Sequence, residues 1–386
     1  MATFSKGSGY SKADLKTSGK PIILYGRMYT KYETIIRNVD TFAEEKAGSV
    51  YSESGDVIVP ASGETAQDIS RASVVANSGI LLGGDINIIH PNNELNPGFL
   101  ALTISNGNQQ KKLSMKAQGA TIVHLHNEDL KGVDILCPSI DEQTLISEFF
   151  ERIDNTITLH QRKLDGMKLL KKSLLQKMFP KNGESVPEVR FPGFTDAWTQ
   201  SKFGPLVTIE RGGSPRPIDR FITDSPNGLN WVKIGDAPKQ GNYITKTAEK
   251  IRPEGLSKTR EVHPGDLILS NSMSFGKPYI MAINGCIHDG WLAIRNYQNS
   301  FDLKFLCVLL GTSQMLSQYK AMAAGSTVNN LNKELVGSTM VKFPCLDEQR
   351  KIGRFFESFE DSLSINQREI DELQKLKTSF SQQMFV

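Results

Sequence analysis

The sequence lacks the features of a membrane protein and of a secreted, disulfide-bonded protein. No apolar run approaches the roughly 20 residues that a membrane-spanning helix needs, and the N-terminal residues lack the apolar core of a signal peptide. The four cysteines, Cys137, Cys286, Cys307 and Cys345, are scattered without Cys-x-x-Cys spacing. This pattern favours free thiols in a reducing compartment, so we expect a cytoplasmic protein.

The motifs of common catalytic centres are also missing. The sequence contains no Gly-x-x-x-x-Gly-Lys phosphate loop, no Gly-x-Ser-x-Gly turn and no Asn-Pro-Pro-aromatic motif, the signature of amino-methyltransferases. His124 and His126 would share one face of a short strand, but no cysteines or His-Glu-x-x-His pattern lie nearby. We therefore expect no catalytic residue, no metal site and no cofactor bound by this chain.

The length and the net charge of the chain restrict its possible structure and function less than the missing motifs do. At 386 residues, of which 39% are hydrophobic and 23% charged, the chain can form two or three soluble domains. The net charge of +3 permits nucleic-acid binding without requiring it, because strongly basic domains carry more positive charge.

What the chain does contain is a pair of long proline-free stretches that resemble each other. Asp141–Phe179 and Asp347–Phe385 both begin with Asp-Glu-Gln, both end with Met-Phe and are rich in good helix formers. Their apolar residues recur at alternating steps of three and four, the spacing of a seam packed against another long helix. The first seam is Ile146, Phe149 or Phe150, Ile153, Ile157, Leu164, Met167, Leu174 and Met178, and the second is Ile352, Phe356, Phe359, Leu363, Ile370, Leu373, Phe380 and Met384.

Both seams are interrupted by polar residues at the same two places. His160 and Lys171 in the first stretch correspond to Asn366 and Lys377 in the second when Asp141 is aligned with Asp347. Two unrelated long helices would not be expected to carry polar residues at the same two positions of their apolar seams. We therefore interpret the two stretches as one module used twice. Polar seam residues can fix helix register at some cost in stability. We predict a register or partner-docking role for eight residues: Phe149, Phe150, His160, Lys171, Phe355, Phe356, Asn366 and Lys377.

The repeat extends beyond the helices. Gly55-Asp56 corresponds to Gly265-Asp266 ahead of an expected strand, and Pro138 corresponds to Pro344 ahead of each helix. We predict an α+β protein with two globular blocks and an antiparallel intramolecular coiled coil, related by an approximate two-fold axis. The expected parts are a first block at 1–137, a first helix at 138–182, an extended lead-in at 183–200, a second block at 201–343 and a second helix at 344–386.

Within the blocks we expect short strands and one longer helix each. The strands are predicted at Pro21–Tyr25, Val57–Pro60, Ile86–Ile89, Ala120–Leu125, Trp231–Ile234, Asp266–Ser270, Tyr279–Ile283 and Met340–Phe343. Single helices are predicted at Asn96–Lys116 and Asp302–Ala323. The lead-in contains Arg190-Phe191-Pro192-Gly193-Phe194 and Trp198, so we expect it to dock rather than to hang free.

Side chains suited to DNA cluster in the expected turns of both blocks. Arginine and lysine neutralise phosphates or bind guanine, and small polar residues bind the backbone or base edges. For any one residue, solvation at the surface is an equally good interpretation. The predicted DNA-binding residues are Lys6, Ser8, Tyr10, Lys12, Arg27, Ser62 and Thr121 in the first block, and Arg211, Ser214, Arg216, Lys233, Asn271, Ser272, Ser274, Lys277, Ser326, Thr327 and Asn329 in the second.

Taken together, these features resemble the specificity subunit of type I restriction-modification systems. The resemblance is carried by Arg190–Phe194 with Trp198, by Trp231–Asp236, by the two Gly-Asp turns and by the Pro-x-x-Asp-Glu-Gln openings of both helices. It covers essentially the whole chain. The departure is the first block, which has no counterpart of the lead-in.

The resemblance implies a function without bond chemistry in this chain. Each block would be a target recognition domain for one half of a bipartite, asymmetric double-stranded DNA sequence. The helices would set the spacer and dock two methyltransferase (modification) subunits. S-adenosylmethionine would bind to those subunits, and ATP and Mg to separate restriction (translocase) subunits. The alternative is a non-catalytic coiled-coil scaffold that binds proteins rather than DNA.

Overall fold

The computed structural model describes residues 1–117, 122–238, 240–271, 276–323 and 331–385. The chain divides into two compact units: unit 1 comprises Met1–Arg162 with Glu369–Val386, and unit 2 comprises Lys163–Arg368. Each unit therefore contains one globular block and a part of each long helix. No helix among the described residues is long and apolar enough to cross a membrane.

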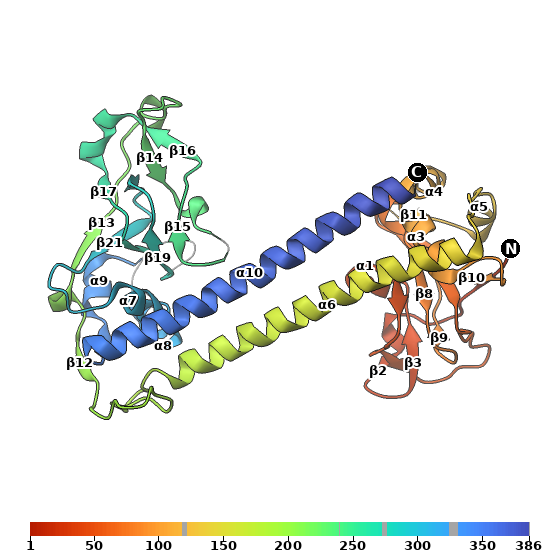
Figure 1. Cartoon of the computed structure of the whole chain (residues 1–386), viewed down its shortest axis with the longest axis horizontal. Coiled ribbons are helices and arrows are strands. Elements are labelled where there is room, and N and C mark those ends of the chain that lie inside the picture. The colour runs from red at the N-terminus through yellow and green to blue at the C-terminus, as the bar shows by residue number, and fades with distance from the viewer. Residues whose placement is uncertain (118–121, 239, 272–275, 324–330, 386) are drawn as a thin grey trace. The chain divides into compact units, whose positions relative to one another are not determined.

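The two long helices are close to their predicted bounds. Helix α6 covers Ile140–Lys177 and helix α10 covers Leu346–Met384 (Figure 1). Within unit 1 the N-terminal half of α6 packs against the C-terminal half of α10, because Phe149 meets Phe380 with ring centroids 5.2 Å apart. Within unit 2 the remaining parts of the two helices pack together, as the contact between the side chains of Asn366 and Met167 shows. The early residue of α6, Phe149, thus meets a late residue of α10, and the later residue Met167 meets an earlier one. The two helices therefore form the predicted antiparallel coiled coil.

Unit 1 is built on a five-stranded and a four-stranded sheet. The five-stranded sheet has the order β1-β10-β6-β8-β4, antiparallel except for the last pair. The four-stranded sheet has the order β2-β5-β3-β9 and ends in the parallel pair β3–β9. Strand bounds are Ala2–Lys6 (β1), Leu15–Lys16 (β2), Lys20–Ile23 (β3), Ile35–Ile36 (β4), Phe42–Ala43 (β5), Asp56–Pro60 (β6), Ser62–Gly63 (β7), Ser73–Val75 (β8), Leu81–Leu82 (β9), Ile86–Pro91 (β10) and Val123–His124 (β11).

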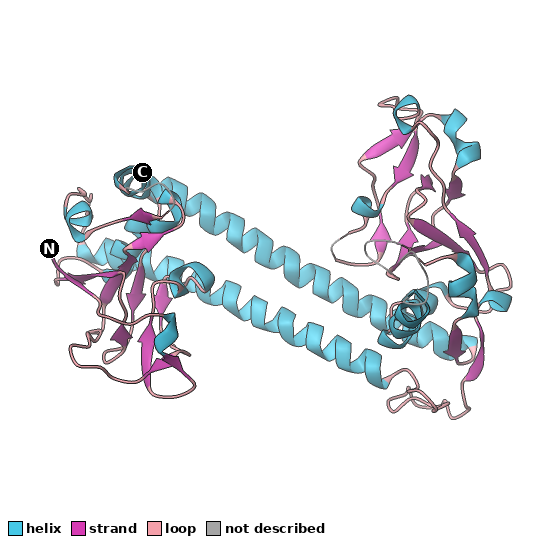
Figure 2. Cartoon of the chain, turned by 180° about the vertical axis from the view of Figure 1, so that it is seen from behind, coloured by secondary structure: helices cyan, strands magenta, loops and turns pink. Residues whose placement is uncertain are grey.

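Unit 2 repeats the five-stranded sheet of unit 1 strand for strand, in the order β13-β21-β18-β19-β15 with a parallel last pair. Its four-stranded sheet, β16-β14-β20-β17, differs because the parallel pair β14–β20 lies in its middle and not at its end. Figure 2 shows the strands of both units in magenta. A further pair, β12 with β22, has no counterpart among the strands described in unit 1. The bounds are Thr199–Lys202 (β12), Thr208–Arg211 (β13), Leu229–Val232 (β14), Tyr243–Ile244 (β15), Glu249–Ile251 (β16), Arg260–Val262 (β17), Leu267–Ser270 (β18), Pro278–Met281 (β19), Gly285–Ile287 (β20), Trp291–Arg295 (β21) and Met340–Phe343 (β22).

The predicted block helices Asn96–Lys116 and Asp302–Ala323 are wrong as single helices, since each is broken once. The first is α3 (Pro97–Ser105) followed by α4 (Gly107–Lys116), because Asn106 is extended and Gly107 has a φ of 63°. A side chain at Gly107 would collide with the carbonyl oxygen of Phe385. The second is α7 (Leu303–Leu310) followed by α8 (Ser313–Ala323), with Gly311 as the C-cap of α7. Shorter helices are α1 (Arg27–Thr30), α2 (Ala66–Ile69), α5 (Asn127–Lys131) and α9 (Lys333–Ser338).

The predicted strands lie within a few residues of the observed ones, with two exceptions. Of the predicted Ala120–Leu125, only Val123–His124 is a described strand, and residues 120 and 121 lie outside the described part. The predicted Trp231–Ile234 instead stops at Val232, because residues Ile234–Asp236 turn into a short 3-10 helix. That turn is closed by the Asp236 carboxylate, which accepts a hydrogen bond from the Lys233 amide.

Each unit buries its own core, and both long helices contribute to each. In unit 1, Phe150 of α6 and Phe385 after α10 pack with Phe99 of α3. In unit 2, Phe179 after α6 and Phe356 of α10 pack with Phe305 of α7. Full burial of one such aromatic side chain contributes about 1.5–3 kcal/mol, so each helix end is anchored firmly to its block.

Candidate nucleic-acid interface

A glutamine latch attaches each block to its helix. The Gln143 side chain accepts a hydrogen bond from the Asn96 amide and donates to the Glu94 and Pro138 carbonyl oxygens. Asn96 in turn caps α3 by accepting from the Phe99 amide. Gln143 is 1% exposed, so the alternative to these bonds would be a buried, unsatisfied amide.

Unit 2 contains the same latch at corresponding positions. The Gln349 side chain accepts from the Asp302 amide and donates to the Ser300 and Pro344 carbonyl oxygens. Asp302 caps α7 by accepting from the Phe305 amide. The role of these glutamines was not predicted from the sequence, although the duplication of the Asp-Glu-Gln boxes is a signal that points to them.

Reciprocal ion pairs cross the helix seam. Lys171 pairs with Glu360 in unit 2, and Lys377 pairs with Asp154 in unit 1. The two pairs correspond under the repeat, since Lys171 aligns with Lys377 and Asp154 with Glu360. All four side chains are between 19% and 28% exposed. Partial burial makes such pairs stronger than surface pairs and makes a mismatched charge costly.

The other two polar seam positions have different partners. His160 Nδ1 lies 3.1 Å from Glu369 Oε2 in unit 1. Asn366, 4% exposed, donates to the Ser362 carbonyl oxygen on its own helix at 2.8 Å and contacts Met167. Of the aromatic residues predicted alongside them, Phe150 and Phe356 are buried, whereas Phe149 is partly exposed and Phe355 half-buried.

Five of the predicted DNA-binding residues are exposed cations, and several others are not at the surface. Ser8, Ser214 and Lys233 are half-buried, Tyr10, Ser62 and Asn271 are at most 7% exposed, and the Arg27 side chain is 8% exposed. Thr121, Ser272, Ser274, Ser326, Thr327 and Asn329 lie outside the described residues. The exposed cations are Lys6, Lys12, Arg211, Arg216 and Lys277.

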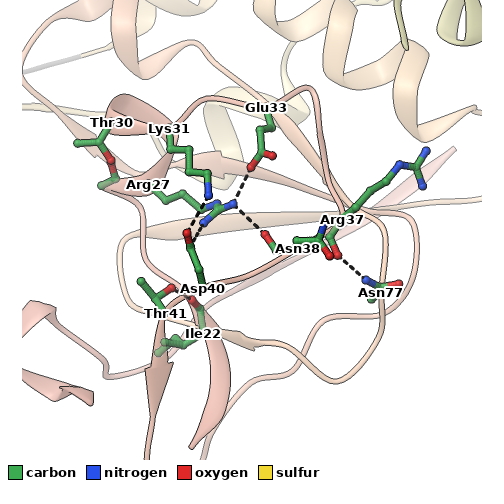
Figure 3. Close-up of polar contacts among 11 residues, drawn as sticks. Ile22, Arg27, Thr30, Lys31, Glu33, Arg37, Asn38, Asp40, Thr41 and Asn77 are labelled. Atoms are coloured by element: carbon green, nitrogen blue, oxygen red, sulfur yellow. Dashed lines mark hydrogen bonds and ion pairs between the residues drawn. The ribbon is translucent and has the colours of Figure 1, made fainter. Parts of the chain in front are cut away.

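The side chain of Arg27, the first residue of α1, is hydrogen-bonded to residues of the segment that follows this helix (Figure 3). Its guanidinium donates to Asp40 at 2.8 Å, to Glu33 at 2.6 Å and to the Asn38 carbonyl oxygen at 2.9 Å. Lys31 adds a second cation to Asp40 at 2.8 Å. Lys31 and Arg27 hold the pKa of the Asp40 carboxyl at about 2, below its ordinary value. This geometry uses the Arg27 guanidinium to order the loop.

Tyr10, Ser62 and Asn271 are likewise engaged within the fold. The Tyr10 hydroxyl lies 2.6 Å from Ser49 Oγ and accepts from the Lys46 amide. Ser62 Oγ lies 3.1 Å from His124 Nδ1. Asn271 donates its side-chain amide to the Asp289 carbonyl oxygen at 2.8 Å. These side chains support the loops around them.

Unit 2 has an open hollow beside the exposed Arg216. Its volume is about 1100 Å³, and its walls include Ser214, Arg216, Trp231, Lys233 and His288. Burial lowers the pKa of His288, which favours the neutral ring at neutral pH. Arg216, with its side chain 81% exposed, offers donors for phosphate or guanine. Nδ1 of His288 accepts a hydrogen bond from the Gly290 amide, so the neutral ring offers Nε2–H as a donor.

Unit 1 has a hollow of about 750 Å³ in its own block. It is lined by tyrosines and polar groups that include Tyr25, Tyr29, Ser62 and Arg71. The Tyr29 hydroxyl donates to the Ser62 carbonyl oxygen at 2.7 Å, and burial raises its pKa. The two hollows differ in their lining residues, so the two blocks present different chemistry to a ligand. Among the described residues, no group of three or more His, Cys, Asp and Glu side chains is arranged to hold a metal ion.

Comparison with known proteins gives concordant results. A family model described as the type I restriction modification DNA specificity domain matches residues 1–169 and 196–375. The chain is 21% identical over 309 residues to the putative type I restriction enzyme MjaX specificity subunit of Methanocaldococcus jannaschii, covering 77% of this chain and 69% of the relative. It is 22% identical over 274 residues to the EcoDI specificity subunit of Escherichia coli, covering 63% of this chain and 59% of the relative.

Solved structures show the same fold. The chain resembles the type I restriction-modification S subunit from M. genitalium with a TM-score of 0.66 at 15% identity, covering all of this chain and 94% of the other. A chain from a study of type I R-M complex assembly and conformational transition gives a TM-score of 0.55 at 19% identity, over 88% of this chain and 85% of the other.

Proposed function

Because the chain belongs to the type I restriction modification DNA specificity family, we propose that it selects the DNA sequence on which a restriction-modification complex acts. Two family domains along one chain are the observation that carries this proposal. Each domain occupies one of two repeated units, and the units differ in their exposed side chains. Two different readers on one molecule suit a bipartite, asymmetric target in double-stranded DNA.

The proposal assigns no bond chemistry to this chain. Two methyltransferase (modification) subunits would dock on the helices and hold S-adenosylmethionine, and restriction subunits would use ATP and Mg. Of the predicted docking residues, Phe149 fits such a role, since it is 38% exposed. The complex would act in the cytoplasm.

DNA binding in the presence of a methyltransferase partner tests the proposal. Affinity should fall steeply as salt rises, because cations such as Arg216 would displace counterions from phosphates. One duplex should bind far more tightly than a scrambled duplex of equal length. Absence of DNA affinity with the partner present would contradict the proposal and favour the protein-binding scaffold.

A further inference from the structure

Unit 2 contains a groove whose walls carry four lysines, which we call the lysine groove. It has a volume of about 480 Å³ and is lined by residues of α6, of α10 and of the block. Lys168, Lys171 and Lys172 come from α6, and Lys277 lies directly before β19. Since Lys168 and Lys172 are four positions apart in the helix, their side chains lie on the same face. The helix and the block therefore place cations around one opening.

Three of the four lysines have no carboxylate partner. Lys171 is paired with Glu360 across the helix seam. Lys168, Lys172 and Lys277 are exposed, and no carboxylate of the described residues lies within salt-bridge distance of their ammonium groups. Glu360 is the one acidic residue among the described residues that line the groove. Four positive charges against one negative charge leave the groove with a net charge of +3, which attracts an anion.

The lysine groove also contains uncharged groups that bind anions. Helix α8 begins at Ser313 on the groove wall, and the N-terminus of a helix carries a partial positive charge. The side chains of Gln176 and Asn242 bring amide donors. The ammonium group of Lys277 lies 5.1 Å from the centre of the Tyr279 ring, a cation–π contact that orders this flexible side chain. Charged and uncharged donors thus line the same opening.

DNA phosphates are the anions that best match the rest of unit 2. One of the two matches to the DNA specificity domain, residues 196–375, lies mostly in this unit. The exposed Arg216 at the other hollow of the unit offers donors to bases. Lysine carries a compact point charge that neutralises phosphates without reading bases. An acidic protein surface would be attracted by the same charge, and the experiment below distinguishes the two.

The lysine groove has no equivalent charge in unit 1. Under the repeat, Lys168 corresponds to Gln374 and Lys172 corresponds to Thr378. The two unpaired lysines of α6 thus have neutral counterparts. Contacts through this groove would be made beside one half-site only.

We propose that the lysine groove binds phosphates of the DNA backbone beside the half-site that unit 2 reads. This inference rests on the proposed function and deepens it, because it separates two tasks within one unit. The block selects bases, and the lysine groove anchors the backbone whatever the sequence. The anchor is made by the long helix together with the block, so the helix contributes to DNA affinity as well as to assembly.

Salt titration of DNA binding tests the proposal on the full chain with its methyltransferase partner. Each lysine that neutralises a phosphate contributes about one unit to the slope of log affinity against log salt. Lys168→Ala with Lys172→Ala should make the slope shallower by about two, and adding Lys277→Ala should make it shallower by about one more. Affinities for the specific duplex and for a scrambled duplex should fall by the same factor. Lys171 is left unchanged so that its pair with Glu360 stays intact.

The matched control is Lys163→Ala with Lys320→Ala. Both of these lysines are exposed in unit 2, and neither lines the lysine groove. Lys168→Arg with Lys172→Arg keeps the charge and should keep the slope. The proposal is overturned if the control variant flattens the slope as much as the alanine variant does. It is also overturned if the alanine variant keeps the original slope, and weaker binding of the methyltransferase subunit in that case would identify an acidic protein surface as the occupant.

Ethylation interference supplies a second readout that locates the contacts. Ethylated phosphates beside the half-site of unit 2 should reduce binding, and Lys168→Ala with Lys172→Ala should weaken this interference beside that half-site only. The half-site concerned is the one whose bases change when the block of unit 2 is exchanged. An identical interference pattern for the unaltered and the variant chains would overturn this inference alone. Absence of DNA binding by the unaltered complex would instead overturn the proposed function, and this inference with it.

Discussion

At the scale of single residues, Arg27 shows how a cation suited to DNA can instead be structural. Its charge is matched by Glu33 and Asp40 and its side chain is 8% exposed. Sequence can identify an arginine in a turn, but it cannot reveal that two carboxylates six and thirteen positions later fold back onto it. Asn271 is a similar case, because its side-chain amide donates to the Asp289 carbonyl oxygen.

Replacing Arg27 should therefore affect folding rather than sequence choice. Arg27→Ala leaves Glu33 and Asp40 without a buried partner and should lower the free energy of unfolding by about 1–3 kcal/mol. Lys31→Ala is the control, since its pair with Asp40 is exposed and should contribute less than about 1 kcal/mol. Denaturant unfolding measures both. If Arg27→Ala left the free energy of unfolding unchanged and altered the DNA sequence selected, Arg27 would be a DNA-binding residue.

Arg216 should behave in the opposite way. Its side chain is 81% exposed at the hollow of unit 2, so its removal costs little folding energy. Arg216→Ala should weaken DNA binding by about 1–3 kcal/mol if it binds a base, with relaxed selection at one position. Arg252→Ala is the matched control, because Arg252 is exposed in the same unit and does not line the hollow. Equal losses for both variants in a competition assay would mean that Arg216 provides only general charge.

At the scale of elements, the long helices were the most predictable part of the chain. The periodic stretches Asp141–Phe179 and Asp347–Phe385 agree with the observed helices α6 and α10 within about two residues at each end. The agreement is close because an apolar pattern that keeps the helical period over so many residues is compatible only with one continuous helix. The block helices were less predictable. At the first break a side chain on Gly107 would collide with the Phe385 carbonyl oxygen, a contact distant in sequence that no local pattern encodes. At the second, the Gly311 amide caps α7 with local bonds to the Val308 and Leu309 carbonyl oxygens.

The reciprocal ion pairs should contribute to helix register. Lys171→Glu places two negative charges together at a partly buried position and should lower stability by about 1–3 kcal/mol. Adding Glu360→Lys restores the pair in reverse and should recover most of that loss, which a double-mutant cycle measures as coupling. Lys172→Glu, at an exposed neighbouring position, is the control. Additive effects of the two substitutions would show that the pair does not act as a unit.

At the scale of the whole molecule, the internal repeat predicted more than any single motif. Duplicated latches, ion pairs and sheet topologies confirm that one module is used twice. The target bases could not be predicted, because recognition depends on loop side chains whose placement is set by the fold and not by a general code.

Under the proposed function, the helix pair determines the length of the spacer between the two half-sites. Deleting residues 160–166 together with 363–369 removes one heptad from each helix and leaves both reciprocal ion pairs in place. At about 1.5 Å per residue the loss is about 10 Å, or roughly three base pairs of DNA. Methylated sites should keep their bases and lose about three positions of spacer. If the folded deletion variant kept the original spacer length, the helices would not determine the spacer.

The most direct test is a methylome map from cells that express the chain with its methyltransferase partner. The map should show a bipartite motif with two specific halves and a non-specific spacer. When residues 201–343 are replaced by the corresponding block of a relative, one half should change while the other half is retained. A motif that stays the same after this exchange, or that changes in both halves, would contradict the account.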